Sequence, residues 1–262
     1  VVVESNLLGI SSPLPDPLNK TATTPLPLRI ERTAPDATRE QYRITLGKVA
    51  QGLVVRRQEN WERAVFAVGD GELRLPEKGL AVRVATPSID ADAWRNFLPD
   101  GATNGDGNGL ALNVVTLKTP VLRLFERDYN QVDVSLRPRD GGWQIALNTR
   151  EAVGDVFWRS AGEGWIEGNF KRLTIRPAAE AGGVSTSLIN TLPGMNLVVE
   201  DFQWGDMALG KLELKARNEK GAWNLDTLNL QNPDGALKGK AVWNNVGRNL
   251  SSLDFELTAT DI

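Results

Sequence analysis

Carboxylates, lysine, tyrosine and serine are the side chains with which this sequence could do catalytic chemistry, because its 262 residues contain neither histidine nor cysteine. Without imidazole and thiolate, Ser-His-Asp and Cys-His catalysis, the usual zinc sites and His- or Cys-ligated haem are excluded. Two close carboxylate pairs remain, Asp90 with Asp92 and Asp70 with Glu72. Such pairs can hydrolyse glycosides. The same spacing also arises in the first turn of a helix or on the polar face of a strand, and we favour this structural interpretation.

A glycine- and asparagine-rich stretch, residues 104–109, resembles the first half of a calcium-binding loop. The twelfth position of that loop would be Val115, where a bidentate glutamate is required. A phosphate-binding glycine loop would need a helix to follow it, but a strand pattern follows instead. We therefore predict no metal, no cofactor and no catalytic residue, and expect that the chain is not an enzyme.

Tryptophan is the most prominent residue type that could contact a ligand. The eight tryptophans are Trp61, Trp94, Trp143, Trp158, Trp165, Trp204, Trp223 and Trp243. They could stack on sugar rings, as in a glycan-binding β-sandwich, or line an apolar interior that is dry or filled with lipid. Trp143 and Trp223 each precede aliphatic residues of the same strand face, which favours the apolar interior.

The elements that carry these residues are predicted to be strands. Val132, Val134 and Leu136 alternate with polar residues, and so do Leu212, Leu214 and Ala216. Gly-, Asn- and Asp-rich turns separate such segments at hairpin distances, so we predict an antiparallel sheet of roughly fifteen to seventeen strands. Helices are expected only at residues 88–98, capped by Ser88, and for one turn at 186–190.

The sequence also repeats itself. A shift of 80 residues places Leu117 on Leu197, Leu122 on Phe202, Leu124 on Trp204, Val132 on Leu212, Val134 on Leu214, Trp143 on Trp223 and Ile145 on Leu225. With small gaps, Trp158 falls on Trp243. Each unit is a meander of strands that cannot bury its apolar face alone, so neighbouring units are expected to stack in one continuous sheet.

These patterns predict a mainly β protein built as one extended, curled antiparallel sheet that forms a groove. Strands are spaced about 4.8 Å apart, and a long flat sheet with one apolar face is unstable in water. Such a sheet must close, pair with a second sheet or curl around an apolar trough. We predict one continuous segment over residues 1–262, with approximate units 1–109, 110–190 and 191–262.

Charge and hydropathy limit the partners. Lys and Arg total 30 against 33 Asp and Glu, and a net charge of −3 does not favour nucleic acid. No stretch approaches the 18 or so apolar residues that a membrane-spanning helix needs. The chain begins without Met and both ends have strand patterns, so we interpret it as a piece of a longer protein.

Several passages resemble the YhdP-like proteins of the AsmA-like superfamily. Residues 3–20 combine a strand with a Leu-Pro-x-Pro-Leu-x-Lys loop, and residues 89–94, Ile-Asp-Ala-Asp-Ala-Trp, are similar to a short motif of the wider superfamily. Residues 201–204, 209–214 and 230–235 resemble the C-terminal region of the same proteins. The resemblance covers most of residues 1–262 and points to an internal or C-terminal section.

The resemblance implies a periplasmic location in Gram-negative bacteria, as part of a protein anchored in the inner membrane. YhdP-like proteins are similar to TamB and to bridge-like lipid transfer proteins, whose β-grooves are thought to carry phospholipid between the inner and outer membranes. The implied function is therefore phospholipid transport that supports outer-membrane lipid homeostasis. The implied partners are phospholipid and, through parts outside this chain, both membranes, with no catalytic residues to carry over. A closed scaffold that binds no ligand remains an alternative.

Under this hypothesis, one face of the sheet is the groove floor that contacts acyl chains. The predicted floor residues are Leu122, Leu124, Val132, Val134, Leu136, Trp143, Ile145, Leu147, Phe202, Trp204, Leu212, Leu214, Trp223, Leu225, Phe255 and Leu257.

Overall fold

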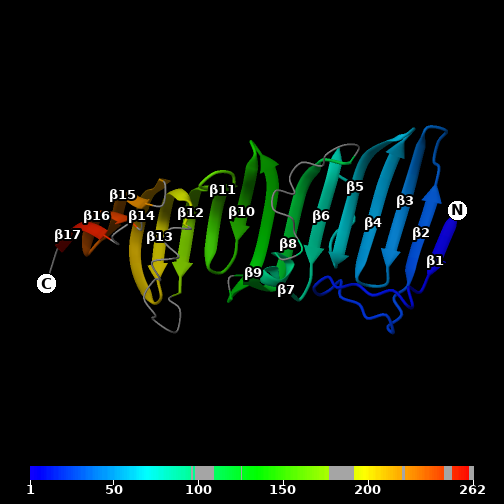
Figure 1. The fold of residues 1–262 in the computed structure, drawn as a ribbon, viewed down its shortest axis with the longest axis horizontal. Helices are drawn as coiled ribbons and strands as arrows, with labels where there is room; N and C mark the ends of the chain where they lie inside the picture. The colour runs from blue at the N-terminus through cyan, green and yellow to red at the C-terminus, as the bar shows by residue number, and fades with distance from the viewer. Residues whose placement is uncertain are drawn as a thin grey trace. The chain divides into compact units, whose positions relative to one another are not determined.

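The computed structural model describes residues 1–95, 97, 109–124, 126–176, 192–219, 222–244 and 250–259. These residues form seventeen strands and one short helix, so the prediction of a mainly β protein is confirmed. The chain divides into two compact units, Val1–Pro138 (unit 1) and Arg139–Ile262 (unit 2). In each unit, the strands lie side by side in a single sheet (Figure 1).

Unit 1 contains nine strands and the helix. They are β1 (Val2–Ser5), β2 (Leu28–Thr33), β3 (Arg39–Leu46), β4 (Ala50–Arg57), β5 (Asn60–Gly69), β6 (Gly79–Ala85), β7 (Ser88–Asp90), α1 (Ala91–Arg95), β8 (Leu112–Leu124) and β9 (Arg127–Arg139). The sheet order is β1-β2-β3-β4-β5-β6-β8-β9, and β7 pairs with the far end of β8.

Unit 2 contains eight strands that pair in chain order. They are β10 (Gly142–Asn148), β11 (Ala152–Arg159), β12 (Trp165–Ile175), β13 (Gly194–Trp204), β14 (Met207–Glu219), β15 (Ala222–Asn232), β16 (Gly235–Asn244) and β17 (Leu250–Ala259). Most neighbours are joined by hairpins, as the Gly- and Asn-rich turns predict.

The sheets are mixed, which corrects the expectation of antiparallel pairing throughout. The pairs β5–β6, β6–β8 and β7–β8 in unit 1 and β12–β13 in unit 2 are parallel. A parallel pair needs a connection that returns the chain to the end where it started. Residues 70–78 make this return between β5 and β6, and no hairpin turn joins those strands.

The helix is shorter than predicted and is capped by another residue. Ser88 belongs to β7, which pairs with β8 until Asp90, so the helix cannot begin at Ser88. Asp90 Oδ1 accepts a hydrogen bond from the Ala93 backbone N–H at 2.9 Å, and Asp90 is therefore the N-cap of α1. The turn predicted at residues 186–190 lies outside the described residues.

Strand registers follow the 80-residue shift found in the sequence. Leu117 on β8 pairs with Val134 on β9, and 80 residues later Leu197 on β13 pairs with Leu214 on β14. Trp143 pairs with Trp158, and Trp223 pairs with Trp243 in the same way. The chain is thus repeat-like in register, whereas the unit boundaries near 109 and 190 stay a prediction.

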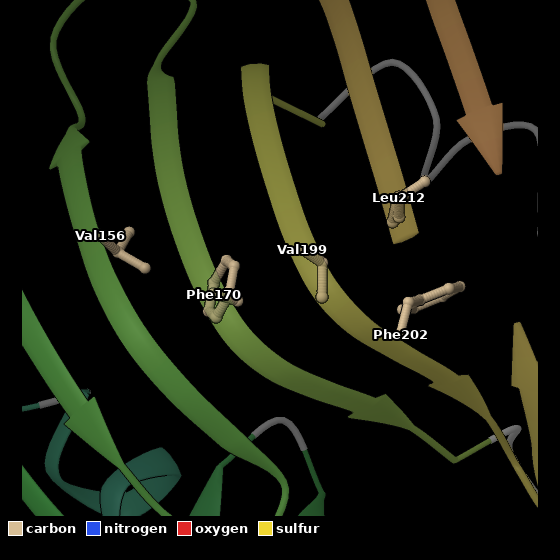
Figure 2. Packing of buried hydrophobic residues seen from close by; sticks show 5 residues of the cluster. All are labelled: Val156, Phe170, Val199, Phe202 and Leu212. Atoms are coloured by element: carbon tan, nitrogen blue, oxygen red, sulfur yellow. The ribbon is translucent and has the colours of Figure 1, made fainter. Parts of the chain in front are cut away.

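A buried apolar cluster of unit 2 lies on one face of its sheet. Figure 2 shows its five members, Val156, Phe170, Val199, Phe202 and Leu212, on the neighbouring strands β11 to β14. The β13–β14 register shifts between Val199 and Phe202, and this irregularity keeps both side chains in the same cluster although they are three positions apart along the strand. The core of unit 2 is therefore one-sided.

Candidate functional site

One face of the unit 2 sheet is apolar from one edge strand to the other. Three rows of directly paired residues cross all eight strands, and none of their members is polar. The first row is Leu147, Gly154, Phe170, Val199, Leu212, Leu230, Leu237 and Leu257; the second is Ile145, Val156, Gly168, Leu197, Leu214, Leu228, Gly239 and Phe255; the third is Trp143, Trp158, Ile166, Met195, Ala216, Leu225, Ala241 and Leu253. Paired residues point to the same side of a sheet.

The opposite face of unit 2 is polar. A row that lies between the first two apolar rows consists of Ala146, Asp155, Asn169, Val198, Glu213, Asn229, Lys238 and Glu256. Ion pairs also lie on this face: Arg217 Nε donates to Asp226 Oδ2 at 2.6 Å, and this hydrogen bond lowers the pKa of the Asp226 carboxyl below its usual range. Water therefore solvates this face, whereas the opposite, apolar face favours contact with nonpolar groups.

Unit 1 has an equivalent apolar face. Its first row is Val3, Ile30, Ile44, Gly52, Phe66, Val82, Val115 and Leu136, and its second is Ser5, Leu28, Leu46, Ala50, Val68, Val84, Leu117 and Val134. Ser5, on the edge strand β1, is the single polar member of these two rows. Both units thus present rows of aliphatic and aromatic side chains that run across the strands.

The apolar faces are only partly buried. Phe66 is 38% exposed, Trp158 40% and Phe255 46%, although all three belong to the apolar rows. Each described strand of unit 2 packs mainly against its neighbours in the sheet. Among the described residues of this unit, no second layer of strands or helices covers the apolar face. We therefore take this face as the candidate binding surface.

Glycines that lie beneath aromatic rings make the surface of the apolar rows more even. Gly52 pairs with Phe66 and Gly239 pairs with Phe255. A Cβ at Gly52 would lie 2.8 Å from the Phe66 ring, so the ring occupies the space that a side chain would fill. At Gly239 the Phe255 ring lies closer still. The rows therefore combine large rings with glycines, and their surface has few ridges.

Comparison with known proteins decides the family. The chain matches the YhdP protein family over residues 1–262. It belongs to that family. The resemblance drawn from the Leu-Pro-x-Pro-Leu-x-Lys loop and the later motifs is thereby confirmed.

A relative of this YhdP-family chain is the "Intermembrane phospholipid transporter YhdP" of Escherichia coli (strain K12), which is 25% identical over 194 residues. The match covers 71% of this chain but only 15% of the relative, so the chain spans a small part of the relative's length. No solved structure matches the chain significantly.

Most of the predicted floor residues lie on the apolar face of their own unit. Strand pairing places Val132, Val134 and Leu136 on that face of unit 1, with Val132 beside Thr119. In unit 2 the same holds for Trp143, Ile145, Leu147, Phe202, Trp204, Leu212, Leu214, Trp223, Leu225, Phe255 and Leu257. Their role as a lipid-binding floor stays a prediction.

Leu122 and Leu124 stand apart from these rows. They are half-buried and pair with Tyr129 and Arg127. The β8–β9 register runs without a slip from Leu117 to Leu124, and residues an odd number apart in a strand point to opposite sides. The register therefore does not continue the apolar rows through these two leucines.

One of the two candidate carboxylate pairs, Asp90 with Asp92, has structural partners. Asp90 caps α1, and Asp92 Oδ2 accepts a hydrogen bond from the Glu126 backbone N–H at 2.8 Å. The calcium-like stretch 104–109 lies outside the described residues. Within the described ranges, no group of three or more acidic side chains is arranged to hold a metal ion. In the same ranges, no helix is long and apolar enough to cross a membrane.

Sequence reasoning missed the apolar face of β1 to β6. The signal was present in the alternation of β3 and β4, where Ile44 and Leu46 face Gly52 and Ala50. The small residues in β4 weakened the alternation, because glycine and alanine add little hydrophobicity. Here the repeat gave only a weak further copy, in which Trp61 precedes residues 70–73 much as Trp223 precedes residues 234–237, and it did not reinforce the alternation.

Proposed function

We propose that this chain is a section of a periplasm-spanning bridge that conducts phospholipid along the apolar faces of its sheets between the inner and outer membranes. The observation that carries the proposal is the set of three rows in unit 2, which cross eight strands without a polar residue. Membership of the YhdP family and a relative named as an intermembrane phospholipid transporter support the choice of cargo.

The energetics favour movement over tight binding. Each acyl CH₂ gains about 0.8 kcal/mol when it leaves water for an apolar surface. That gain is nearly the same at every point of a uniformly apolar row, so a chain that slides from one strand to the next meets small barriers. A row with no polar residue and with rings seated over glycines is such a surface. The face serves as a path with no single binding site for the acyl chains.

The headgroup stays outside the rows. Burying a charged phosphate without partners is very costly, so headgroups remain in water at the ends of the strands. The bridge as a whole is anchored in the inner membrane by a segment outside this chain and supports the lipid balance of the outer membrane. The chain performs no catalytic step in this function.

Photo-crosslinking in cells tests the proposal. A photoreactive amino acid replaces one residue of the full-length protein at a time: Leu214 or Val134 on the apolar faces, and Lys215 or Glu213 on the polar face. Crosslinked phospholipid is then identified by mass spectrometry. We expect lipid adducts at Leu214 and Val134 and none at the two polar-face positions.

Two results would contradict the proposal. Adducts at equal frequency on both faces would mean non-specific contact with membranes. Absence of lipid adducts at Leu214 and Val134 in folded protein would favour a scaffold that binds no ligand, or the glycan-binding alternative if saccharide adducts form at these two positions in their place.

A further inference from the structure

A cluster of charged and aromatic side chains lies at one end of the apolar face of unit 1. Its members, which we name the rim cluster, are Arg32, Glu40, Tyr42, Arg56 and Trp61. Arg32 pairs with Tyr42, Glu40 with Arg56, and Arg56 with Trp61. Along β3, Glu40 lies four residues and Tyr42 two residues before Ile44 of the first apolar row. This even spacing puts them on the same face as Ile44.

The members of the rim cluster contact one another. Glu40 forms an ion pair with Arg32 and accepts a hydrogen bond from Tyr42 Oη at 2.7 Å. Arg56 Nη1 lies 3.7 Å from Glu40 Oε2, and the Arg56 guanidinium lies 5.6 Å from the centre of the Trp61 ring. The Tyr42 and Trp61 rings meet edge to face, with centroids 5.8 Å apart. The cluster is therefore preorganised in the structure.

The rim cluster carries an excess positive charge. Two guanidinium groups share the single Glu40 carboxylate, and hydrogen bonds from Arg32 and then Tyr42 lower the pKa of Glu40, so it is ionised at neutral pH. The nearest further pair, Arg39 with Glu62 at 3.8 Å, balances itself. Arg32 and Arg56 side chains are 43% and 33% exposed. Both arginine side chains are therefore partly open to solvent, from which an anion can approach them.

The other end of the same face has a different character. There Gly47 donates a backbone hydrogen bond to Pro27 at 2.7 Å, and the Leu26 side chain packs against Gly47. These loop residues are apolar and form no ion pair in the described structure. The loop residues that meet at this end, Leu26, Pro27 and Gly47, are apolar with the exposed Lys48 beside them, whereas two arginines and a tryptophan lie at the other end.

We propose that the rim cluster binds the phosphate group of a phospholipid whose acyl chains lie on the apolar rows of unit 1. The inference rests on the proposed function and adds a headgroup site to it. Guanidinium groups bind phosphate through paired hydrogen bonds, and tryptophan favours the boundary between apolar and aqueous surroundings. From Glu40 to Ile44 the strand advances about 13 Å, at 3.3 Å per residue. A glycerophospholipid can place its phosphate at the cluster and its chains on the rows.

The rim cluster fixes the orientation of the lipid without binding it tightly. One excess positive charge at a partly exposed site attracts a phosphate modestly, since salt and water screen it. The lipid is then oriented with its headgroup at the Trp61 end of the strands, while its acyl chains remain free to shift between rows.

Two photoreactive phospholipids test the inference on the whole chain. One carries a diazirine in its headgroup and the other carries it at the end of an acyl chain; both are supplied in vesicles, and labelled peptides are mapped by mass spectrometry. In the unaltered protein, we expect the headgroup label on peptides of the rim cluster and the acyl label on strands of the apolar rows.

The double variant Arg32→Gln/Arg56→Gln should reduce headgroup labelling of the cluster about tenfold and leave acyl labelling of the rows unchanged. The matched control is Arg217→Gln, an arginine on the polar face of unit 2 whose side chain is 50% exposed, and this change should alter neither label. If the double variant does not fold, Arg56→Lys keeps the charge beside Trp61 and removes the paired hydrogen bonds, and it should reduce headgroup labelling by itself.

The outcomes separate the inference from the proposed function. Equal headgroup labelling in folded variants overturns the rim site while acyl labelling still supports the apolar path. Excess inorganic phosphate should compete with the headgroup and lower its labelling of the cluster while acyl labelling stays intact; headgroup labelling that does not respond to phosphate overturns a phosphate site. Absence of acyl labelling from the rows of the unaltered protein would instead contradict the proposed function.

Discussion

At the scale of single residues, glycines decide where strands can approach one another. A Cβ at Gly154 would lie 2.7 Å from the Phe170 Cα and closer still to the Asn169 carbonyl oxygen, and both are backbone atoms that cannot give way. We expect Gly154→Ala to lower the free energy of unfolding by about 1–3 kcal/mol, as other overpacked sites do. Thermal melting measures this, at roughly 2–4 °C per kcal/mol for a chain near this size.

Gly239→Ala is the matched control. The three atoms nearest its new Cβ all belong to the Phe255 ring, and Phe255 is 46% exposed and can swing away. We expect a change within about 0.5 kcal/mol, because the lost contact is offset by the reduced freedom of the unfolded chain. Equal destabilisation by the two changes would contradict the role assigned to the backbone contact at Gly154.

Lys20 organises the loop before β2. It is one of few buried charged residues, and its ammonium donates to the backbone oxygens of Leu7, Ile10 and Thr21 at 2.8, 2.6 and 3.0 Å. Lys20→Met should leave these three carbonyls without their donor. We expect the Ser12 amide, which donates to the Lys20 carbonyl, to exchange with solvent at least about tenfold faster.

The exposed Lys48 supplies the comparison for this loop, because Lys48→Met removes a charge without removing a buried donor. Its exchange pattern should match that of the unaltered chain. If the loop amides of Lys20→Met exchange as slowly as before, the ammonium is not what holds the loop.

At the scale of elements, the β14–β15 hairpin carries a cross-strand ion pair on its polar face. Arg217 lowers the pKa of Asp226 chiefly through a hydrogen bond, so the pair contributes stability above the ordinary aspartate pKa near ~3.9 and loses it as pH falls through the lower folded value. Since the Arg217 side chain is 50% exposed, the contribution should be below about 1 kcal/mol. Asp226→Asn should therefore flatten the fall in melting temperature at acid pH.

The comparison for the hairpin is Asp234→Asn, which alters an exposed carboxylate in the β15–β16 turn. This variant should keep the acid slope of the unaltered chain. An unchanged slope in Asp226→Asn would mean that the pair with Arg217 adds nothing measurable to stability.

Strand pairing shows how far sequence reasoning reaches. Alternation and the 80-residue shift predicted which residues of β9, and which residues of β13 to β15, share a face within their own unit, because the hairpins in these strands fix the register. They did not predict the parallel pairs. A turn signal specifies the next strand only when the connection is short, and residues 70–78 carry no feature that distinguishes a return from a hairpin.

Sequence reasoning likewise predicted one part of the candidate site and missed another. Val134, Leu214 and Trp223 were predicted on the apolar face from their period-two spacing, and pairing places them there. The rim cluster was not foreseen. Arg32, Arg56 and Trp61 come from three different strands and form a cluster only when strand pairing brings them together. In the sequence, each is an ordinary polar or aromatic residue of a strand end.

At the scale of the whole molecule, both units present an apolar face, and conduction would use the two in series. Val134 in unit 1 and Leu214 in unit 2 occupy equivalent positions in the repeat and lie in apolar rows of their units. In a path used in series, a barrier at either position limits the flow. Two separate lipid-binding sites would behave otherwise, because a change in one would leave the other at work.

The last prediction separates these possibilities. An aspartate at either position places a carboxylate where acyl chains pass, at a cost of several kcal/mol unless it is protonated or hydrated. In cells that depend on the full-length protein, Val134→Asp and Leu214→Asp should each abolish function, and the double variant should be no worse than either one. Lys215→Asp, one residue along and on the polar face, should retain function, and melting curves must show that every variant folds. Partial loss in each single variant, with a larger loss in the double variant, would instead indicate two independent binding sites and would contradict conduction along one path.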